Sequence, residues 1–183
     1  MGLDMYLNKK TYVKRWDHQS ENERHSVAVK RGGVIRSDVK EERISYVVEE
    51  VAYWRKANAI HQWFVDHCAD GLDNCGEMYV KEETLKELLD ACKIVVGSLK
   101  DKERTESKKI HTGWAKGKDT FEDVPVFSDE DTATAREMLP SQEGFFFGST
   151  EYDKWYVNDL EETIKMLEPL VEEGGEFYYE ASW

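Results

Sequence analysis

The chain has 183 residues, of which 40% are hydrophobic and 12% aromatic, and its formal net charge at pH 7 is −13. This length is typical of one domain, and this composition suffices for a buried core, which excludes a globally disordered chain. No run approaches the roughly eighteen apolar residues that a membrane span needs, and no basic segment followed by an apolar one opens the chain. We therefore expect no membrane partner, no secretory signal and a cytoplasmic location.

The charge is distributed unevenly along the chain. Residues 1–60 hold 12 Lys and Arg against 9 Asp and Glu, residues 61–119 hold 10 against 12, and residues 120–183 hold 3 against 17. The last third therefore carries −14, more than the whole net charge. Proteins that bind duplex DNA directly usually present a basic face that displaces counterions from the phosphates, so direct duplex binding is not expected.

Strand signals dominate the N-terminal region. Residues 3–7 and 11–13 are rich in aliphatic and aromatic side chains and are predicted to form a first strand. Residues 26–36 contain paired glycines between apolar pairs, which favours a β-hairpin because glycine readily takes the positive φ angles of a tight turn. Residues 44–48 are β-branched and aromatic, which fits a short strand or the lead-in to a helix.

Two segments further along have the apolar periodicity of helices. The pattern predicts a helix over residues 49–70, whose main stripe consists of Tyr53, Ala57, Ile60 and Phe64. Leucine and valine at 3.6-residue spacing predict a second helix over residues 82–96, with Gly97 as its C-cap. Residues 99–123 are polar and glycine-dotted, and we expect a long polar loop there or an element that the pattern does not reveal.

The C-terminal third is predicted to add two helices and a strand. Residues 129–139 favour a short helix with acidic residues in its first turn. Residues 144–148, Gly-Phe-Phe-Phe-Gly, indicate a buried strand or a hydrophobic turn. A long final helix is expected from a cap at Ser149 or Thr150 to about Val171, before a closing strand.

Together these elements predict an α+β fold. We expect one acidic domain over residues 1–183, with a small, mostly antiparallel sheet and three to four helices. Six Trp and nine Tyr are many for this length, so some aromatic rings are expected at the surface. Exposed aromatic rings are common at protein interfaces, so a homodimer is one of the alternatives for the oligomeric state.

One cluster resembles metal ligands, and it consists of His61, His67, Cys68 and Cys75. Zinc sites usually present two close ligand pairs, whereas this spacing supplies no second pair of the same kind. We therefore expect structural roles here and neither a metal nor a cofactor. The alternative is a metal-stabilised adaptor that uses the last three of these residues.

Motifs for catalysis are missing from the sequence. It contains no nucleophile elbow and no glycine-rich phosphate loop, and its acidic residues are so numerous that no carboxylate pair stands out. No catalytic residue is assigned. An enzyme is left open, with a non-catalytic role favoured.

A run of mixed aromatic and polar residues is a candidate pocket. Its members are Trp54, Arg55, Asn58 and His61. They fit either a buried helix whose polar groups are all hydrogen-bonded or a polar pocket with an Arg–aromatic stack. The second interpretation predicts a small enzyme or a nucleotide-binding protein.

The acidic third has two interpretations as well. It can simply keep an aromatic-rich protein solvated, or it can imitate a polyanion, since duplex DNA carries one charge per roughly 1.7 Å of its axis. Such a surface would be drawn to a basic nucleic-acid channel. The candidate partner-binding residues are Asp129, Glu130, Asp131, Glu151, Asp153, Asp159, Glu161 and Glu162.

Three strings resemble those of a widespread family of small phage and prophage proteins. They are residues 1–7 (Met-Gly-Leu-Asp-Met-Tyr-Leu), residues 53–65 (Tyr-Trp-Arg-Lys-Ala-Asn-Ala-Ile-His-Gln-Trp-Phe-Val) and residues 144–153 (Gly-Phe-Phe-Phe-Gly-Ser-Thr-Glu-Tyr-Asp). The likeness covers most of the chain and is weakest at residues 99–123. The strings are specific to the family and not to a chemistry, so no catalytic residue is carried over.

The size and origin of this family resemble those of phage anti-CRISPR proteins that inhibit Cas9. The resemblance implies an inhibitor in the bacterial host that binds Cas9 with its guide RNA and blocks DNA binding or cleavage through an acidic surface. Cas9 holds its nucleic acids in positively charged channels, which suits an acidic competitor. The basic N-terminal third departs from a uniformly acidic mimic and leaves open a contact with guide RNA through Lys9, Lys10, Lys14, Arg15, Lys30 and Arg31.

Overall fold

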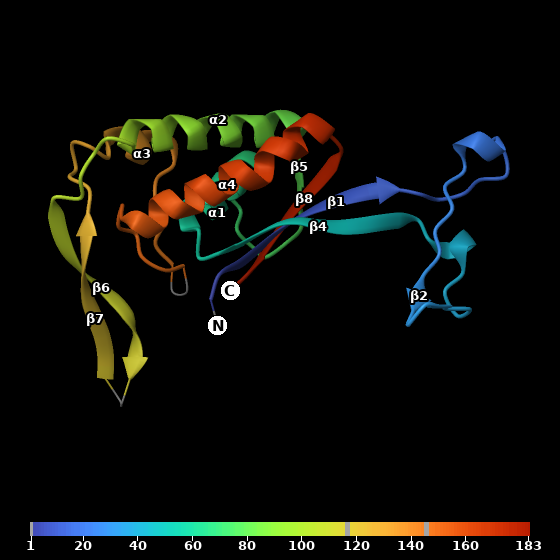
Figure 1. Cartoon of the computed structure of the whole chain (residues 1–183), viewed down its shortest axis with the longest axis horizontal. Coiled ribbons are helices and arrows are strands. Elements are labelled where there is room, and N and C mark those ends of the chain that lie inside the picture. Colours follow the sequence, from blue (N-terminus) through green and yellow to red (C-terminus); the bar gives the residue numbers. More distant parts are fainter. Residues whose placement is uncertain (1, 116–117, 145–146) are drawn as a thin grey trace.

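A four-stranded antiparallel sheet with the strand order β4-β1-β8-β5 organises the fold (Figure 1). The computed structural model describes residues 2–115, 118–144 and 147–183. The strands of the sheet are β1 (Asp4–Tyr12), β4 (Tyr46–Arg55), β5 (Met78–Val80) and β8 (Glu176–Ser182). The N-terminal and C-terminal strands therefore lie side by side at the centre of the sheet, which confirms the predicted closing strand.

The two faces of the sheet differ in burial. Met5 and Leu7 of β1 and Tyr179 of β8 point to the covered face and are fully buried. Tyr6 and Tyr53 point to the opposite face, where their ring centroids lie 5.4 Å apart. This period-two alternation is what a sheet with one covered face produces.

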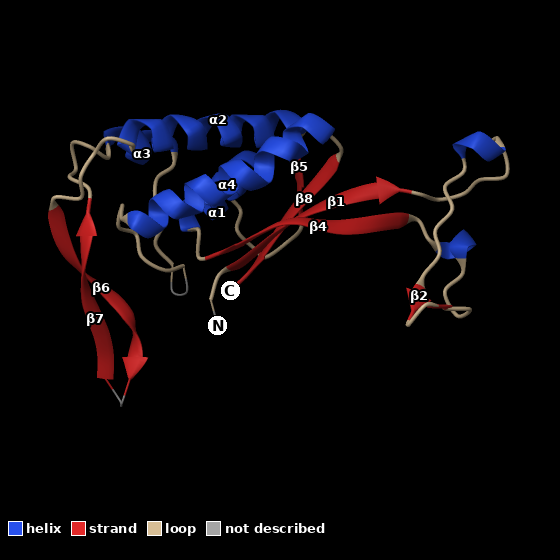
Figure 2. Cartoon of the chain, in the orientation of Figure 1, coloured by secondary structure: helices blue, strands red, loops and turns tan. Residues whose placement is uncertain are grey.

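Four α-helices occur among the described residues, and they lie on one side of the sheet (Figure 2). They are α1 (Asn58–Cys68), α2 (Glu82–Leu99), α3 (Ala133–Met138) and α4 (Lys154–Glu173). The α+β fold with a mostly antiparallel sheet is thus confirmed. Helix α2 lies where its apolar stripe predicts it, but it continues through Gly97, which is not a C-cap. None of the described helices has the length and apolar character needed to cross a membrane.

The predicted helix over residues 49–70 is wrong in its first part, because residues 49–55 belong to β4. This strand pairs with β1 from Tyr12↔Tyr46 to Asp4↔Arg55. Its inward and outward side chains alternate, with Trp54 buried and Tyr53 exposed. Sheet pairing therefore decides the conformation of a segment whose aromatic spacing also fits a helix.

Of the two alternatives for residues 99–123, the structure shows an element that the pattern does not reveal and not a long polar loop. Most of this stretch forms a hairpin of β6 (Glu106–Ala115) and β7 (Lys118–Val126) that projects from the body (Figure 1). Few side chains of this hairpin are buried, so its strands lack the alternation of apolar and polar residues that marks a half-buried strand.

The segments that lead into the last helix differ from the prediction in their boundaries. Helix α3 begins at Ala133 instead of residue 129. Helix α4 is capped by Asp153 and not by Ser149 or Thr150, because the Asp153 carboxylate accepts hydrogen bonds from the N–H groups of residues 155 and 156. Of the string Gly-Phe-Phe-Phe-Gly, Phe147 is buried in a bend, while residues 145–146 lie outside the described residues.

A second projection, which we call the arm, consists of residues 12–48. It extends from the ends of β1 and β4 along the long axis of the molecule (Figure 1). Its far end carries the predicted hairpin, formed by β2 (Lys30–Arg31) and β3 (Val34–Ile35). Gly32 and Gly33 take φ angles of 57° and 83° in the turn, which confirms the reason for expecting a hairpin there.

Candidate functional site

A cavity of about 360 Å³ lies where α1 and α4 begin, next to β6. Its polar side chains come from several elements: Arg55 and Asn58 from the β4–α1 junction, His111 and Thr112 from β6, Asp159 from α4, and Ser149, Glu151 and Asp153 from the segment before α4. Cavities of this size, lined by both apolar and convergent polar groups, are typical of small-molecule sites.

The β4–α1 junction is held in an unusual backbone conformation. Lys56 has a φ angle of +62°, and its N–H donates a hydrogen bond of 2.8 Å to the carbonyl of Leu3. Gly148, at a φ of +89°, passes so close that an added Cβ would lie 3.2 Å from the Cβ of Lys56. A non-glycine residue at positive φ is uncommon and often marks a functional site, and here it turns the cationic Arg55–Lys56 pair onto the cavity wall.

The side chain of Asn58 links the start of α1 to the cavity wall formed by Gly148 and Ser149. Its Nδ2 donates hydrogen bonds to the carbonyls of Phe147 (3.1 Å) and Ser149 (2.8 Å), and its Oδ1 accepts one from the N–H of Gln142 (3.0 Å). The side chain is only 5% exposed. The wall that Gly148 and Ser149 contribute to the cavity therefore depends on this one amide.

Two carboxyl groups from the start of α4 line the cavity in different environments. Asp153 is buried, but the N–H groups of the first helical turn stabilise its negative charge. Asp159 is half-buried, and burial, followed by repulsion from Asp153, raises its pKa to about 7. Asp159 thus exchanges its proton near neutral pH, which is the behaviour expected of functional carboxyl groups.

The remaining walls are aromatic and aliphatic. Trp155, 61% exposed, lines the cavity rim together with the buried Ile60 and Leu160. Tyr156 also lines the cavity, but its hydroxyl already donates to the carbonyl of Leu139 at 2.8 Å. Burial raises the pKa of Tyr156, so this phenol stays neutral. The Lys154 ammonium group lies over the Trp155 ring, 4.7 Å from its centroid, so a planar ring would stack on the other indole face.

One ion pair joins the β6–β7 hairpin to the site. Lys108 of β6 lies 2.8 Å from Glu151, and the hydrogen-bonded pair holds the pKa of Lys108 above its usual value. His111 lies 3.0 Å from Asp119 across the hairpin. A segment that the sequence presents as a polar loop is therefore part of the cavity wall.

The predicted pocket is brought together only in part. Arg55 and Asn58 line the cavity, but Trp54 does not, because it is buried on the helix-covered face of the sheet, where its Nε1–H donates to Thr163 of α4 at 2.8 Å. His61 is fully buried away from the cavity, with its ring nitrogens 2.7 Å from the hydroxyl of Tyr179 and 3.1 Å from Asp73. Trp54 and Arg55 are neighbours in a strand, so their side chains point to opposite faces of the sheet. The predicted pocket placed them together because it assumed a helix there.

The candidate metal ligands are dispersed. Within the described ranges, no three His, Cys, Asp or Glu residues are grouped as a metal site requires. His67 stacks on the ring of Trp63 with a centroid distance of 3.7 Å, and Cys75 is exposed. Burial raises the pKa of Cys68 to about 11, which keeps it a neutral thiol instead of the thiolate that binds zinc.

The eight acidic residues predicted to bind a partner do not form one free surface. Four are in ion pairs: Asp129 with Arg136, Asp131 with Lys102, Glu151 with Lys108 and Glu162 with Lys165. Asp153 caps α4, and Asp159 lines the cavity. Only Glu130 and Glu161 are exposed without an ion-pair partner among the described residues. The sequence therefore does not reveal that Asp159 lines a cavity, because in the sequence its carboxyl group is one of many acidic groups.

Comparison of the chain with protein-family models, curated proteins and solved structures gave no match. Its function therefore has to be inferred from its own residues and geometry.

Proposed function

We propose that this protein binds a small ligand in the cavity at the starts of α1 and α4. The observation that carries the proposal is the half-buried carboxyl of Asp159, whose pKa lies at about 7, in the same cavity as the cationic Arg55 and Lys56. A carboxyl group that is half-buried beside a second carboxylate costs stability when it ionises, and proteins keep such groups mainly at functional sites.

The chemistry of the walls limits the class of ligand. Of the acidic residues that also line the cavity, Glu151 is paired with Lys108 and Asp153 caps α4. Arg55 and Lys56 therefore favour an anionic group, for which an arginine supplies paired N–H donors. The exposed indole of Trp155 favours a planar ring, and the hydroxyls of Thr112 and Ser149 offer further hydrogen bonds. A mononucleotide combines a planar ring with an anionic group at a size that suits the cavity.

A thermal-unfolding screen with nucleoside mono-, di- and triphosphates tests this proposal. A ligand at one hundred times its Kd should stabilise the protein by about 2.7 kcal/mol, which raises the Tm of a chain of this length by about 5–10 °C. Arg55→Glu reverses the charge at the anionic end and is expected to weaken binding by at least about tenfold.

The matched control is Lys100→Glu, which makes the same kind of charge reversal at an exposed position at the end of α2. It should leave the ligand-induced shift unchanged. The proposal is contradicted if no nucleotide raises the Tm, or if the shift is equally large in the Arg55→Glu variant.

We also propose, as a second function, that the outer face of the helices binds a basic nucleic-acid enzyme such as guide-loaded Cas9. The supporting observation is an excess of exposed acidic residues on α2 and α4, which carry four exposed lysines against nine exposed acids. The acids are Glu82, Glu83, Glu87, Asp90, Glu161, Glu162, Glu168, Glu172 and Glu173. A surface of this sign steers basic partners and raises their association rate at low salt.

Capture of guide-loaded Cas9 at low and high salt tests the second proposal. The double variant Glu87→Lys with Glu161→Lys should lower the affinity about tenfold, because it reverses two exposed carboxylates of α2 and α4 that have no ion-pair partner among the described residues. The double variant Glu49→Lys with Glu50→Lys, on the exposed edge of β4, changes the net charge equally and should retain binding. Binding that neither salt nor the first variant weakens would exclude a role for this acidic face.

A further inference from the structure

The arm exposes an unusual amount of apolar surface. Eight of the fifteen exposed large hydrophobic side chains among the described residues belong to it: Tyr12, Trp16, Val29, Val34, Ile35, Val39, Tyr46 and Val48. Val13 is the only arm residue that the structure describes as buried. An isolated two-stranded ribbon is at best marginally stable in water, so this surface calls for a partner.

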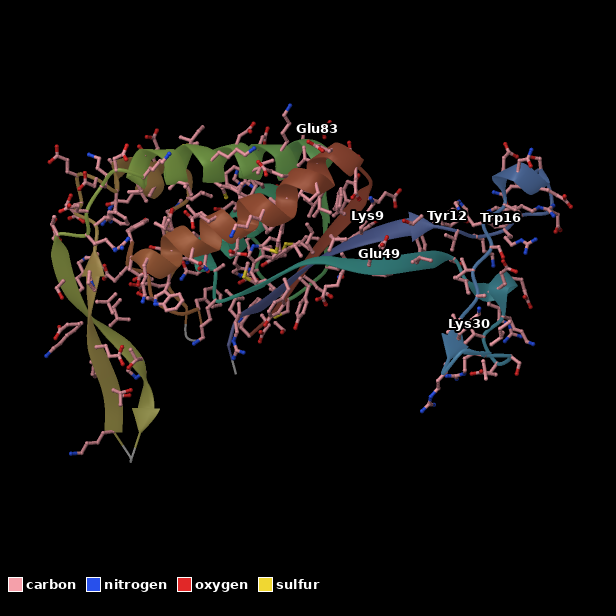
Figure 3. All side chains as sticks on the ribbon, in the orientation of Figure 1. Lys9, Tyr12, Trp16, Lys30, Glu49 and Glu83 are labelled. Atoms are coloured by element: carbon pink, nitrogen blue, oxygen red, sulfur yellow. The ribbon has the colours of Figure 1, made fainter. Side chains whose placement is uncertain are left out.

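The positions of these side chains define two contact regions on the arm. Near the body, Tyr12 and Tyr46 face each other across β1 and β4 with ring centroids 5.1 Å apart, and the indole N–H of Trp16 donates to the Tyr12 hydroxyl at 3.0 Å. At the far end, Val34 and Ile35 are 72% and 63% exposed. The labelled Tyr12, Trp16 and Lys30 show the extent of the arm in Figure 3.

The cations of the arm do not suit a nucleic-acid partner. The arm holds eight Lys and Arg against six Asp and Glu, which gives it a charge of +2, while the rest of the chain carries −15. Lys14 donates to the carbonyl of Glu42, and Arg15 and Arg36 pair with Glu41 and Asp38. At the far hairpin, the exposed Lys30 and Arg31 precede the exposed apolar pair. A small basic and apolar tip fits a protein surface that is apolar and rimmed by acids.

The body of the same protein carries such a surface. A groove of about 540 Å³ runs between α2 and α4 and is lined by the apolar Leu89, Pro169 and Val171. Its charged lining consists of the acids Asp90, Glu168 and Glu172 and the lysines Lys86 and Lys93, which leaves a small acidic excess. Ile94, one helical turn from Asp90, is 52% exposed. The Lys93–Glu168 ion pair of 2.8 Å links the two helices across the groove.

We propose that the arm of one copy docks in the α2–α4 groove of a second copy, so that the protein forms a two-fold symmetric dimer. The arm and the helical body lie end to end along the long axis (Figure 1), and two antiparallel copies would therefore place each arm beside the other copy's body. Two identical contacts form at once, as in other isologous dimers. This dimer goes beyond the proposed ligand binding and does not depend on it. It would cover Asp90, Glu168 and Glu172 of the face proposed to bind a basic enzyme, so the two partners would compete for that face.

Sedimentation velocity at about 50 mM salt, where charge attraction is weakly screened, tests the dimer. The wild type should be dimeric, and the double variant Val34→Glu with Ile35→Glu should raise the dimer Kd at least about tenfold. Because both side chains are exposed, the variant should retain the fold, which circular dichroism checks. Phe121→Glu, a similar change at the exposed β6–β7 hairpin, should leave the dimer intact.

A charge exchange identifies the contact itself. Lys30→Glu with Arg31→Glu makes the arm acidic, and Asp90→Lys with Glu172→Lys makes the groove basic. Each variant alone should be monomeric, while an equimolar mixture should form a heterodimer with both contacts complementary. A wild-type protein that stays monomeric, a dimer that survives the arm variants, or a mixture that remains monomeric would each overturn the proposal.

Discussion

Replacing Asp159 with Asn is expected to raise the free energy of unfolding by about 2 kcal/mol at pH 8 and to leave it nearly unchanged at pH 4. The cause is the burial of the carboxyl beside Asp153, which raises its pKa from 3.8 to about 7. The folded state therefore binds this proton more tightly than the unfolded state does. The wild type loses stability as the pH rises from about 4 to 7, whereas the neutral amide of the variant loses none at this site.

The magnitude follows from the difference between the two pKa values. At about 1.36 kcal/mol for each pKa unit, this difference would be worth about 4 kcal/mol, and the partial exposure of Asp159 reduces this to about 2 kcal/mol. Urea unfolding at pH 4, 6 and 8 measures it. Asp123→Asn removes an exposed carboxylate of β7 and should have little effect at any pH. Equal effects of Asp159→Asn at pH 4 and pH 8 would show that its ionisation is not what destabilises the fold.

The elements that the sequence predicts well are those whose local chemistry agrees with the tertiary structure. The leucine stripe of α2 identifies a helix in any setting, because it matches the helical period along most of the element. The glycine pair at positions 32–33 identifies the β2–β3 hairpin because its positive φ angles are costly for other residues. In both cases the signal lies within the element itself.

The elements that the sequence does not predict depend on distant partners. Residues 49–55 have aromatic spacing that serves a helix as well as a strand, and the pairing of β4 with β1, which is remote in the sequence, decides between them. The boundary falls at Lys56, where the positive φ ends the strand. Strands β6 and β7 are mostly exposed, so they pair without any apolar alternation that a sequence could show.

The candidate site was predictable to the same limited degree. Arg55 and Asn58 stood out because polar residues within an aromatic run need a structural reason. In the sequence Asp159 is one acid among many, because its half-buried place in the cavity and its proximity to Asp153 arise only in the folded chain. A pKa shift of this kind depends on three-dimensional surroundings and has no signature in the local sequence.

Replacing Asn58 with Asp is expected to cause the largest loss of stability at the site, about 3–4 kcal/mol at pH 7. The side chains have the same shape, so packing is preserved and only the hydrogen-bond chemistry changes. Where Nδ2 donates to the carbonyls of Phe147 and Ser149, a carboxylate oxygen would instead face two acceptors in a buried position. Two hydrogen bonds are lost, and the buried carboxylate keeps only the N–H of Gln142 as a donor.

The pH dependence of this variant separates the charge effect from a simple loss of packing. At low pH the introduced carboxyl group is protonated and can donate one hydrogen bond, so Asn58→Asp should recover part of its stability between pH 7 and pH 4 in urea unfolding. Asn158→Asp on the exposed face of α4 makes the same chemical change and should alter stability by less than about 0.5 kcal/mol. The same anchor holds Gly148 and Ser149 in the cavity wall, so Asn58→Asp should also abolish the nucleotide-induced rise in Tm at pH 7. A variant as stable as the wild type at pH 7 would mean that the amide of Asn58 does not hold this wall in place.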